Sequence, residues 1–185
     1  MKVKDLVYIT IFTSIICVLS LITIPATVPF TLQTLAIFIT IYMLKPRNSL
    51  ISVLLYVLIG AIGLPVFSNF NSGFGALAGP TGGYILGFIL MPICGFIFRN
   101  KTITCIVGLA ICYLVGSIWF LVFNTSGINN IWKVLTICVI PFILPDALKL
   151  VLAWFLHKRL IFLAQDLPVN KTEEIEENDD ENSTI

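Results

Sequence analysis

Charged side chains are scarce over most of this chain, and acidic ones are almost absent. The sequence is 58% hydrophobic and only 11% charged, whereas soluble domains typically carry about 25% charged residues. No charge occurs within residues 6–44, 48–98 or 102–132. Each run exceeds the roughly 18 residues that predict a membrane span. Because the chain lacks the polar surface of a soluble fold, its sequence predicts an all-α integral membrane protein.

The sequence also lacks the residues that several kinds of catalysis require. His157 is the only histidine, and its neighbours are basic, so base-assisted attack by a serine or cysteine has little support. No Walker phosphate-binding sequence occurs. The segment Gly73-x-Gly75-x-x-Ala78 partly matches a dinucleotide fingerprint, but it follows no predicted strand and no acidic residue comes about 20 residues later. We expect no enzyme activity, no ATP site in this chain and no cofactor.

The cysteines do not form a metal-binding or disulfide pattern. All five lie inside apolar runs, and none belongs to a CxxC pair: Cys17, Cys94, Cys105, Cys112 and Cys138. An odd number without paired spacing argues against a disulfide framework or a zinc site. We expect these cysteines to be small core residues and expect no metal.

Breaks in the apolar runs divide the chain into six candidate spans. They cover residues 6–24, 30–44, 49–64, 82–98, 103–123 and a last stretch within 132–160. The first follows Lys2 and Lys4 as a secretory signal would, but it is long and more spans follow, so we expect a retained helix. Pro141 and Pro145 interrupt the last stretch, and proline favours the first turn of a helix. The last helix is therefore expected to begin at Pro145, with 132–140 as a separate segment.

Basic residues mark alternate ends of these spans. Lys133 lies on one side, and eight lie on the other: Lys2, Lys4, Lys45, Arg47, Arg99, Lys101, Lys158 and Arg159. The positive-inside rule makes the basic side cytoplasmic. Both termini are then predicted inside, and the loops 25–29, 65–82 and 124–131 outside.

The C-terminal segment differs sharply in charge from the rest. Residues 1–163 carry a net charge of +8 and residues 164–185 one of −7. So acidic a segment has little to bury, and we expect a disordered, solvated tail, with a docking tail as the alternative. The predicted organisation is a six-helix transmembrane domain over 1–163 followed by this tail.

One pair of charges lies where the membrane should exclude it. Asp146 is the only acidic residue between positions 6 and 165, and Lys149 follows three residues later, on the same helix face. A helix from Asp146 to Lys158 is roughly 18 Å long, which places the pair in the outer half of a hydrocarbon core about 30 Å thick. Two interpretations remain open: an ion pair that only fixes helix packing, and a site for a polar ligand.

Polar residues at the start of the second span are further candidates. Gln33 enters a span where an unpaired amide is costly, so we expect it to bond a ligand or another helix. Thr31 and Thr34 can each be explained locally, as a helix cap or a hydroxyl bonded to its own helix.

The stretch 60–87 contains eight of the twelve glycines. A structural interpretation assigns Gly79, Gly83 and Gly87 to close helix packing. A functional one makes the polar loop at 69–72 re-enter the membrane and cap a site, because irregular backbone at that depth must be buried or line a cavity. The sequence does not decide between them.

Four motifs in order resemble the BioY family, the biotin-binding S components of energy-coupling factor (ECF) transporters. They are VPFTLQT at 28–34, GAIGLPVF at 60–67, GPTGGY at 79–84 and PDxxK at 145–149. The resemblance covers about residues 6–160. It implies a six-helix protein of the cell membrane that captures biotin from outside. Import would be driven by a shared transmembrane coupling subunit with two cytoplasmic ATPases, and no nucleic acid is expected as a partner.

The resemblance also implies a binding site and a docking face. The substrate-binding residues would be Asp146, Lys149, Asn71, Asn69, Tyr84, Gln33, Thr31, Phe30 and Phe67. Asp146 would accept a ureido N–H and Lys149 would balance it, while the two phenylalanines pack the rings. The family's first helix presents alanines four apart to the coupling subunit. Here the comparable face carries Thr10, Ser14 and Cys17, still small enough for close approach.

Two other functions remain compatible with these residues. One is an S component or secondary transporter for a different vitamin or small molecule. The other is a membrane scaffold without a ligand, in which Asp146 and Lys149 only pack.

Overall fold

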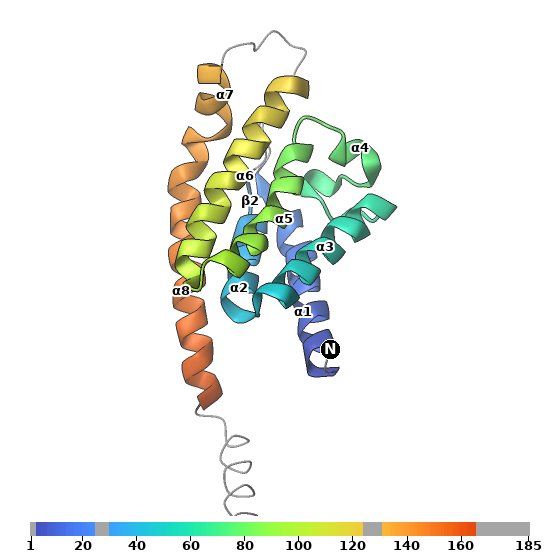
Figure 1. Ribbon diagram of the computed structural model, residues 1–185. Helices are drawn as coiled ribbons and strands as arrows, with labels where there is room; N and C mark the ends of the chain where they lie inside the picture. Colours follow the sequence, from blue (N-terminus) through green and yellow to red (C-terminus); the bar gives the residue numbers. More distant parts are fainter. Residues whose placement is uncertain (1–2, 25–29, 124–130, 166–185) are drawn as a thin grey trace, which may run out of the picture.

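The computed structural model describes residues 3–24, 30–123 and 131–165 and consists mainly of helices (Figure 1). They are α1 (Val3–Leu21), α2 (Gln33–Met43), α3 (Pro46–Ile62), α4 (Gly73–Leu77), α5 (Gly82–Ile97), α6 (Lys101–Phe123), α7 (Ile131–Cys138) and α8 (Ile140–Gln165), with a 3-10 turn η1 (Ser68–Phe70) and strands β1 (Thr23–Ile24) and β2 (Phe30–Thr31). Within this part, Val3–Leu21, Lys101–Phe123 and Val134–Phe162 are long and apolar enough to cross a membrane. The helices α2, α3 and α5 are apolar but shorter.

The second predicted span begins later than expected. Residues 30 and 31 are extended rather than helical, and α2 starts at Gln33. Thr23 pairs with Thr31 and Ile24 with Phe30 in a short antiparallel ladder, a local exception to an otherwise helical fold. β-branched and aromatic side chains favour this extended backbone. The ladder holds Thr31 and α2 at the end of α1.

The predicted start of the last helix is wrong. A break at Val139 does separate α7 from α8, but α8 begins at Ile140 and continues through Pro145. Pro141 lies in the first turn, where a missing N–H has no helical partner anyway. Across the break, the N–H groups of Phe142 and Ile143 both bond to the carbonyl of Val139, at 2.9 and 3.2 Å. Pro145 removes one backbone hydrogen bond from α8, a loss that is tolerated inside a membrane helix when neighbouring helices surround the freed backbone carbonyl.

Glycines bring α5 and α6 into close contact. A Cβ on Gly83 would lie 2.2 Å from the Cβ of Trp119, and one on Gly87 would lie 2.8 Å from the sulfur of Cys112. The close packing predicted for these two glycines is confirmed. Gly79 does not share that role, because it precedes α5 and its nearest atoms belong to its own segment. Its carbonyl instead accepts a hydrogen bond from the indole of Trp119, at 3.0 Å.

The basic connections lie toward one end of the molecule. Figure 1 shows the start of α1, the α2–α3 and α5–α6 connections and the end of α8 all toward the lower end of the view. Lys101 Nζ donates to the carbonyl of Tyr42 at 2.5 Å, which ties the start of α6 to the end of α2. At the same end, the ring nitrogen Nδ1 of His157 lies 3.4 Å from the sulfur of Met43. The α3–α5 segment and the α6–α7 end lie toward the opposite end (Figure 1).

The described cysteines behave as core residues. Cys94, Cys105 and Cys112 are buried, Cys17 is partly buried, and all four are free thiols. Predictions for the side chain of Cys138, for the loops 25–29 and 124–130 and for the acidic tail fall outside the described residues.

Candidate functional site

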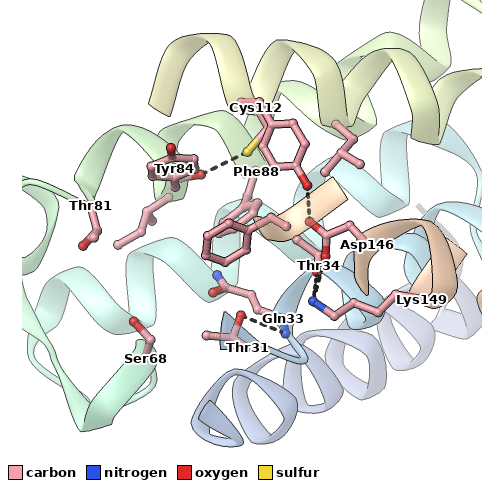
Figure 2. A pocket seen from close by; sticks show the side chains of 14 residues that line it. Thr31, Gln33, Thr34, Ser68, Thr81, Tyr84, Phe88, Cys112, Asp146 and Lys149 are labelled. Atoms are coloured by element: carbon pink, nitrogen blue, oxygen red, sulfur yellow. Dashed lines mark hydrogen bonds and ion pairs between the residues drawn. The ribbon is translucent and has the colours of Figure 1, made fainter. Parts of the chain in front are cut away.

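A cavity of about 590 Å³ lies among α2, α5, α6 and α8. This empty volume includes the part of the cavity that is open to solvent. Its wall is formed by Thr31, Gln33, Thr34, Ser68, Thr81, Tyr84, Ile85, Phe88, Leu109, Cys112, Tyr113, Phe142, Asp146 and Lys149. Figure 2 shows Asp146, Thr34 and Lys149 together on one side of it, with Ser68 and Thr81 on the other.

Asp146 is the centre of a hydrogen-bond network that joins three helices. Its carboxylate is only 2% exposed. Oδ1 accepts from Thr34 Oγ1 at 2.9 Å and from Lys149 Nζ at 2.7 Å. Oδ2 accepts from the hydroxyl of Tyr113 at 2.5 Å. Lys149 also donates to Thr34, at 2.9 Å, so α2, α6 and α8 meet at a buried charge pair that is neutral overall.

This network leaves room for a ligand. A carboxylate offers about four acceptor positions and an ammonium three donors. Within the described residues, three protein donors occupy Asp146 and two acceptors occupy Lys149. One acceptor position on Oδ2 and one ammonium hydrogen remain. The site can therefore receive a ligand that carries a donor next to an acceptor.

Gln33 adds a second polar group whose orientation is fixed from behind. It is 4% exposed, and its Nε2 donates to the hydroxyl of Tyr56 at 2.9 Å. The Tyr56 hydroxyl donates its own hydrogen to the carbonyl of Val66 at 3.2 Å. Its oxygen is therefore the acceptor for the amide hydrogen of Gln33. Within the described residues the side-chain carbonyl of Gln33 has no other partner. The side-chain carbonyl of Gln33 is therefore a hydrogen-bond acceptor on the wall of the cavity.

Aromatic rings supply the apolar part of the site. Phe30 stacks on Phe142 with ring centroids 4.3 Å apart and planes 13° from parallel. Lys149 Nζ lies 5.7 Å from the centroid of Phe30, which attracts the cation. Phe88 and Tyr84 are buried on α5 and face the cavity (Figure 2). The site combines flat apolar walls with a small number of buried polar groups.

A second cavity adjoins the first under the segment that follows α3. It has an empty volume of about 660 Å³ and shares Ser68, Thr81 and Ile85 with the first. Phe67 and Asn71 line this second cavity and not the first. The segment between α3 and α5 thus contributes walls to both cavities.

The residues predicted from the sequence separate into four groups. Asp146, Lys149, Gln33, Thr31 and Tyr84 line the main cavity. Phe30 lies directly behind it, and Phe67 and Asn71 belong to the second cavity. Asn69 lines neither. Its backbone is left-handed at φ 57°, its side chain is exposed, and its Oδ1 accepts from Thr23 at 3.0 Å.

Sequence reasoning missed several wall residues, above all Tyr113. Thr34 had a local explanation as a back-bonded hydroxyl, yet it bonds Asp146, 112 residues away. Tyr113 lies inside an uncharged run, where a tyrosine is common on any helix face. Its only signal was a hydroxyl at membrane depth that needs a partner. No pattern in the sequence could have indicated that the partner is Asp146.

The candidate docking face on α1 is accessible and its hydroxyls are satisfied internally. Thr10 and Ser14 are exposed and donate to the carbonyls of Leu6 and Thr10, each at 3.0 Å. Cys17 is partly exposed beside them. The face is therefore small and carries no unpaired hydroxyl that a docking partner would have to bury.

No group of three or more His, Cys, Asp or Glu side chains comes together in the part of the chain that the structure describes. The chemistry of the cavity thus rests on hydrogen bonds, one charge pair and aromatic walls.

Proteins similar in sequence are named as biotin transporters. A biotin transporter BioY of Thermotoga maritima is 38% identical over 85% of this chain and 95% of its own length. A probable biotin transporter BioY of Pyrococcus horikoshii is 34% identical over 86% of this chain and 98% of its own. A biotin transporter BioY2 of Lactococcus lactis is 35% identical over 86% of this chain and 91% of its own.

The fold and the family profile agree with these relatives. The crystal structure of the S-component for biotin from an ECF-type ABC transporter superposes with a TM-score of 0.75 at 30% identity, over 85% of this chain and 90% of that one. The profile of the BioY family matches residues 1–166. With the match covering nearly all of the helical part, this chain is a membrane protein that belongs to the BioY family.

Proposed function

We propose that this protein is the biotin-binding S component of an ECF-type importer. The observation that carries the proposal is the buried network of Asp146, Lys149, Thr34 and Tyr113, which keeps one acceptor and one donor open to the main cavity. Biotin is the ligand to propose because the similar proteins are named biotin transporters and the similar crystal structure is that of an S-component for biotin.

The ureido ring of biotin fits the polar side of the cavity. This ring has two N–H donors on either side of one carbonyl acceptor. Asp146 Oδ2 accepts one N–H, the remaining hydrogen of Lys149 bonds the carbonyl, and the side-chain carbonyl of Gln33 accepts the second N–H. Tyr56 acts through Gln33, since its hydroxyl holds the amide in the required orientation.

The rest of the ligand extends toward Ser68 and Thr81. The apolar bicycle packs against Phe88 and Phe142. Removing its apolar surface from water makes the main favourable contribution to the binding free energy. The chain that ends in the carboxylate continues into the second cavity, where Asn71 donates to it. This direction keeps the carboxylate away from Asp146. The segment between α3 and α5 closes over the bound ligand and so acts as the cap.

Specificity follows from polar groups that only a urea can satisfy. A vitamin without an N–H at the same place leaves the open position of Asp146 unpaired, which costs about 1–3 kcal/mol per buried group. A ligand without the second N–H likewise leaves the side-chain carbonyl of Gln33 unpaired. Competing vitamins are therefore rejected by unpaired acceptors rather than by size alone.

The six apolar segments form six spans with both termini in the cytoplasm, and the cavity opens to the outside. The basic residues at the α2–α3 and α5–α6 connections support this orientation. A transmembrane coupling subunit docks on Thr10, Ser14 and Cys17 of α1, and two ATPases on the cytoplasmic side supply the energy. The proposed six-helix domain ends with α8 at Gln165, and the acidic segment follows it in the sequence.

Isothermal titration calorimetry of the full-length chain in detergent tests the proposal. One-to-one binding of biotin is expected, weakened about tenfold to a hundredfold by Asp146→Asn, because the carboxamide puts N–H groups where acceptors are needed and leaves Lys149 without a counter-charge.

Asp5→Asn is the matched control, since Asp5 is the other acidic side chain among the described residues and lies at the opposite end of the bundle, bonded by Asn48. Its biotin affinity should equal that of the parent. Equal affinity in Asp146→Asn as well would remove Asp146 from the site. Binding of another vitamin in place of biotin would favour the other transporter. A double apolar replacement of Asp146 and Lys149 that keeps uptake would favour the scaffold.

A further inference from the structure

A second polar surface lies at the end of the molecule far from the substrate cavity. It is an open groove between the end of α2, the start of α6 and the last turns of α8, with an empty volume of about 890 Å³. We call it the basic groove. Its main residues are Tyr42, Lys101, Thr102, Trp154, Lys158 and Phe162.

The two lysines of the basic groove have no carboxylate partner among the described residues. The ion pair formed in that part of the chain is Asp146 with Lys149, and Asp5 bonds to the amide of Asn48. Lys101 donates one ammonium hydrogen to the carbonyl of Tyr42, and its other two ammonium hydrogens remain available as donors. Lys158 Nζ lies 4.1 Å from the ring centroid of Trp154. Among the residues that the structure describes, two cations thus face one groove without a counter-charge.

The same groove has a large apolar rim. Trp154 is 42% exposed, Ile161 44% and Phe162 58%. All three line the groove together with the lysines, and α8 runs on past the other helices at this end (Figure 1). A soluble anion would leave these side chains uncovered. A ligand with a phosphate joined to hydrocarbon would cover them.

We propose that the basic groove binds the headgroup phosphate of an anionic phospholipid from the leaflet at this end of the bundle. The phosphate lies between Lys101 and Lys158, with Thr102 as a further donor. The glycerol and the first carbons of the acyl chains lie against Trp154 and Phe162. Basic pockets between membrane helices are suited to anionic headgroups, and tryptophan is enriched at this depth.

The test is native mass spectrometry of the full-length protein in a neutral detergent, titrated with phosphatidylglycerol or phosphatidylcholine. One phosphatidylglycerol should bind in preference to phosphatidylcholine. Lys101→Gln with Lys158→Gln should weaken it about tenfold to thirtyfold, because each cation near an anionic lipid contributes about 1 kcal/mol.

Lys45→Gln with Arg47→Gln is the matched control. It removes the same charge at the same end from two residues outside the groove, and phosphatidylglycerol binding should be kept. Both variants should bind biotin like the parent, which shows that they fold. Equal loss in the two double variants would mean general attraction to a basic surface and would overturn the proposal, as would equal retention.

Two further arms separate the lipid from other anions. Glycerol 3-phosphate at the lipid's concentration should not displace it; displacement would make this a site for a soluble phosphate. The other arm replaces Glu173, Glu174, Glu176 and Glu177 by glutamine in the full chain. If lipid binds only to that variant, the acidic tail is the natural occupant and the proposal is wrong.

Discussion

At the scale of single residues, one buried carboxylate organises the site. Asp146 accepts from residues on α2 and α6 as well as from Lys149 on its own helix. Three hydrogen bonds, one of them from the ammonium of Lys149, offset the cost of burying this carboxylate at membrane depth. The neighbours that stabilise the Asp146 carboxylate also orient it toward the ligand. Substituting one of these neighbours should therefore change ligand affinity while the carboxylate itself stays in place.

Tyr113→Phe tests that idea. The change removes the hydroxyl that orients Oδ2, the oxygen proposed to receive the ligand, and leaves the ring in place. Biotin affinity in calorimetry should fall about tenfold to a hundredfold, because one hydrogen bond to a charged group contributes about 1.5–3 kcal/mol.

Tyr8→Phe is the matched control for this variant. Tyr8 is 54% exposed on α1 and is remote from the cavity, so its affinity should equal the parent's. A Tyr113→Phe protein with parental affinity would show that Thr34 and Lys149 suffice to orient the carboxylate.

At the scale of helices, the shape of the site depends on how closely α5 and α6 approach. Tyr84 and Phe88 on one helix and Cys112 and Tyr113 on the other line the cavity. Their spacing is set by glycines on both helices, where even a methyl group would clash. Association of helices in a membrane relies on such close packing, because burial from water does not drive it there.

Gly108→Ala should therefore destabilise the protein. An added Cβ would lie 2.9 Å from the Cα of Met91, a backbone atom that cannot rotate away. We expect a loss of about 1–3 kcal/mol, seen as a drop of roughly 2–10 °C in the thermal unfolding midpoint in detergent.

Gly75→Ala provides the comparison, since nothing lies within 4 Å of a Cβ there. Its midpoint should stay close to the parent's. If Gly108→Ala unfolds at the parental temperature, α5 and α6 can separate at little cost and the glycines do not control their distance.

At the scale of the whole molecule, two ends of opposite character define an orientation. The cavity lies away from the connections that carry Lys45, Arg47, Arg99 and Lys101. With the basic end in the cytoplasm, as we propose, ligand is expected to enter from outside and the coupling subunit and ATPases to act from the cytoplasmic side.

Reporter fusions at the C-terminus check this orientation. Green fluorescent protein folds in the cytoplasm and alkaline phosphatase is active only after export. The first fusion should be fluorescent and the second inactive. The reverse pattern would place the C-terminus outside and would contradict the proposed orientation.

The proposed docking face gives a prediction about assembly. Thr10→Leu with Ser14→Leu should lower biotin uptake by the complete transporter by about tenfold, because the larger side chains prevent close helix approach. Calorimetry on the isolated variant should show unchanged biotin affinity, since α1 contributes no residue to the cavity wall. Tyr8→Leu, on another exposed part of α1, should keep uptake. Equal uptake in all three proteins would move the docking face elsewhere.

Sequence reasoning by itself determined the class of the protein, the position of its apolar segments and the charged pair at the centre of the site. These features depend on composition and on neighbours along the chain. A run of uncharged apolar residues indicates a membrane helix whatever surrounds it, and Asp146 is conspicuous because nothing else in the run is acidic.

Only the tertiary structure decided which faces of these helices meet. A helix that is apolar all round has no stripe to indicate its inner side, so the sequence could not bring Thr34 and Tyr113 to Asp146. It also could not place Asn69 away from the cavity or show that α8 continues through Pro145. Those outcomes depend on the rotation and crossing of helices, which contacts between residues far apart in the chain determine.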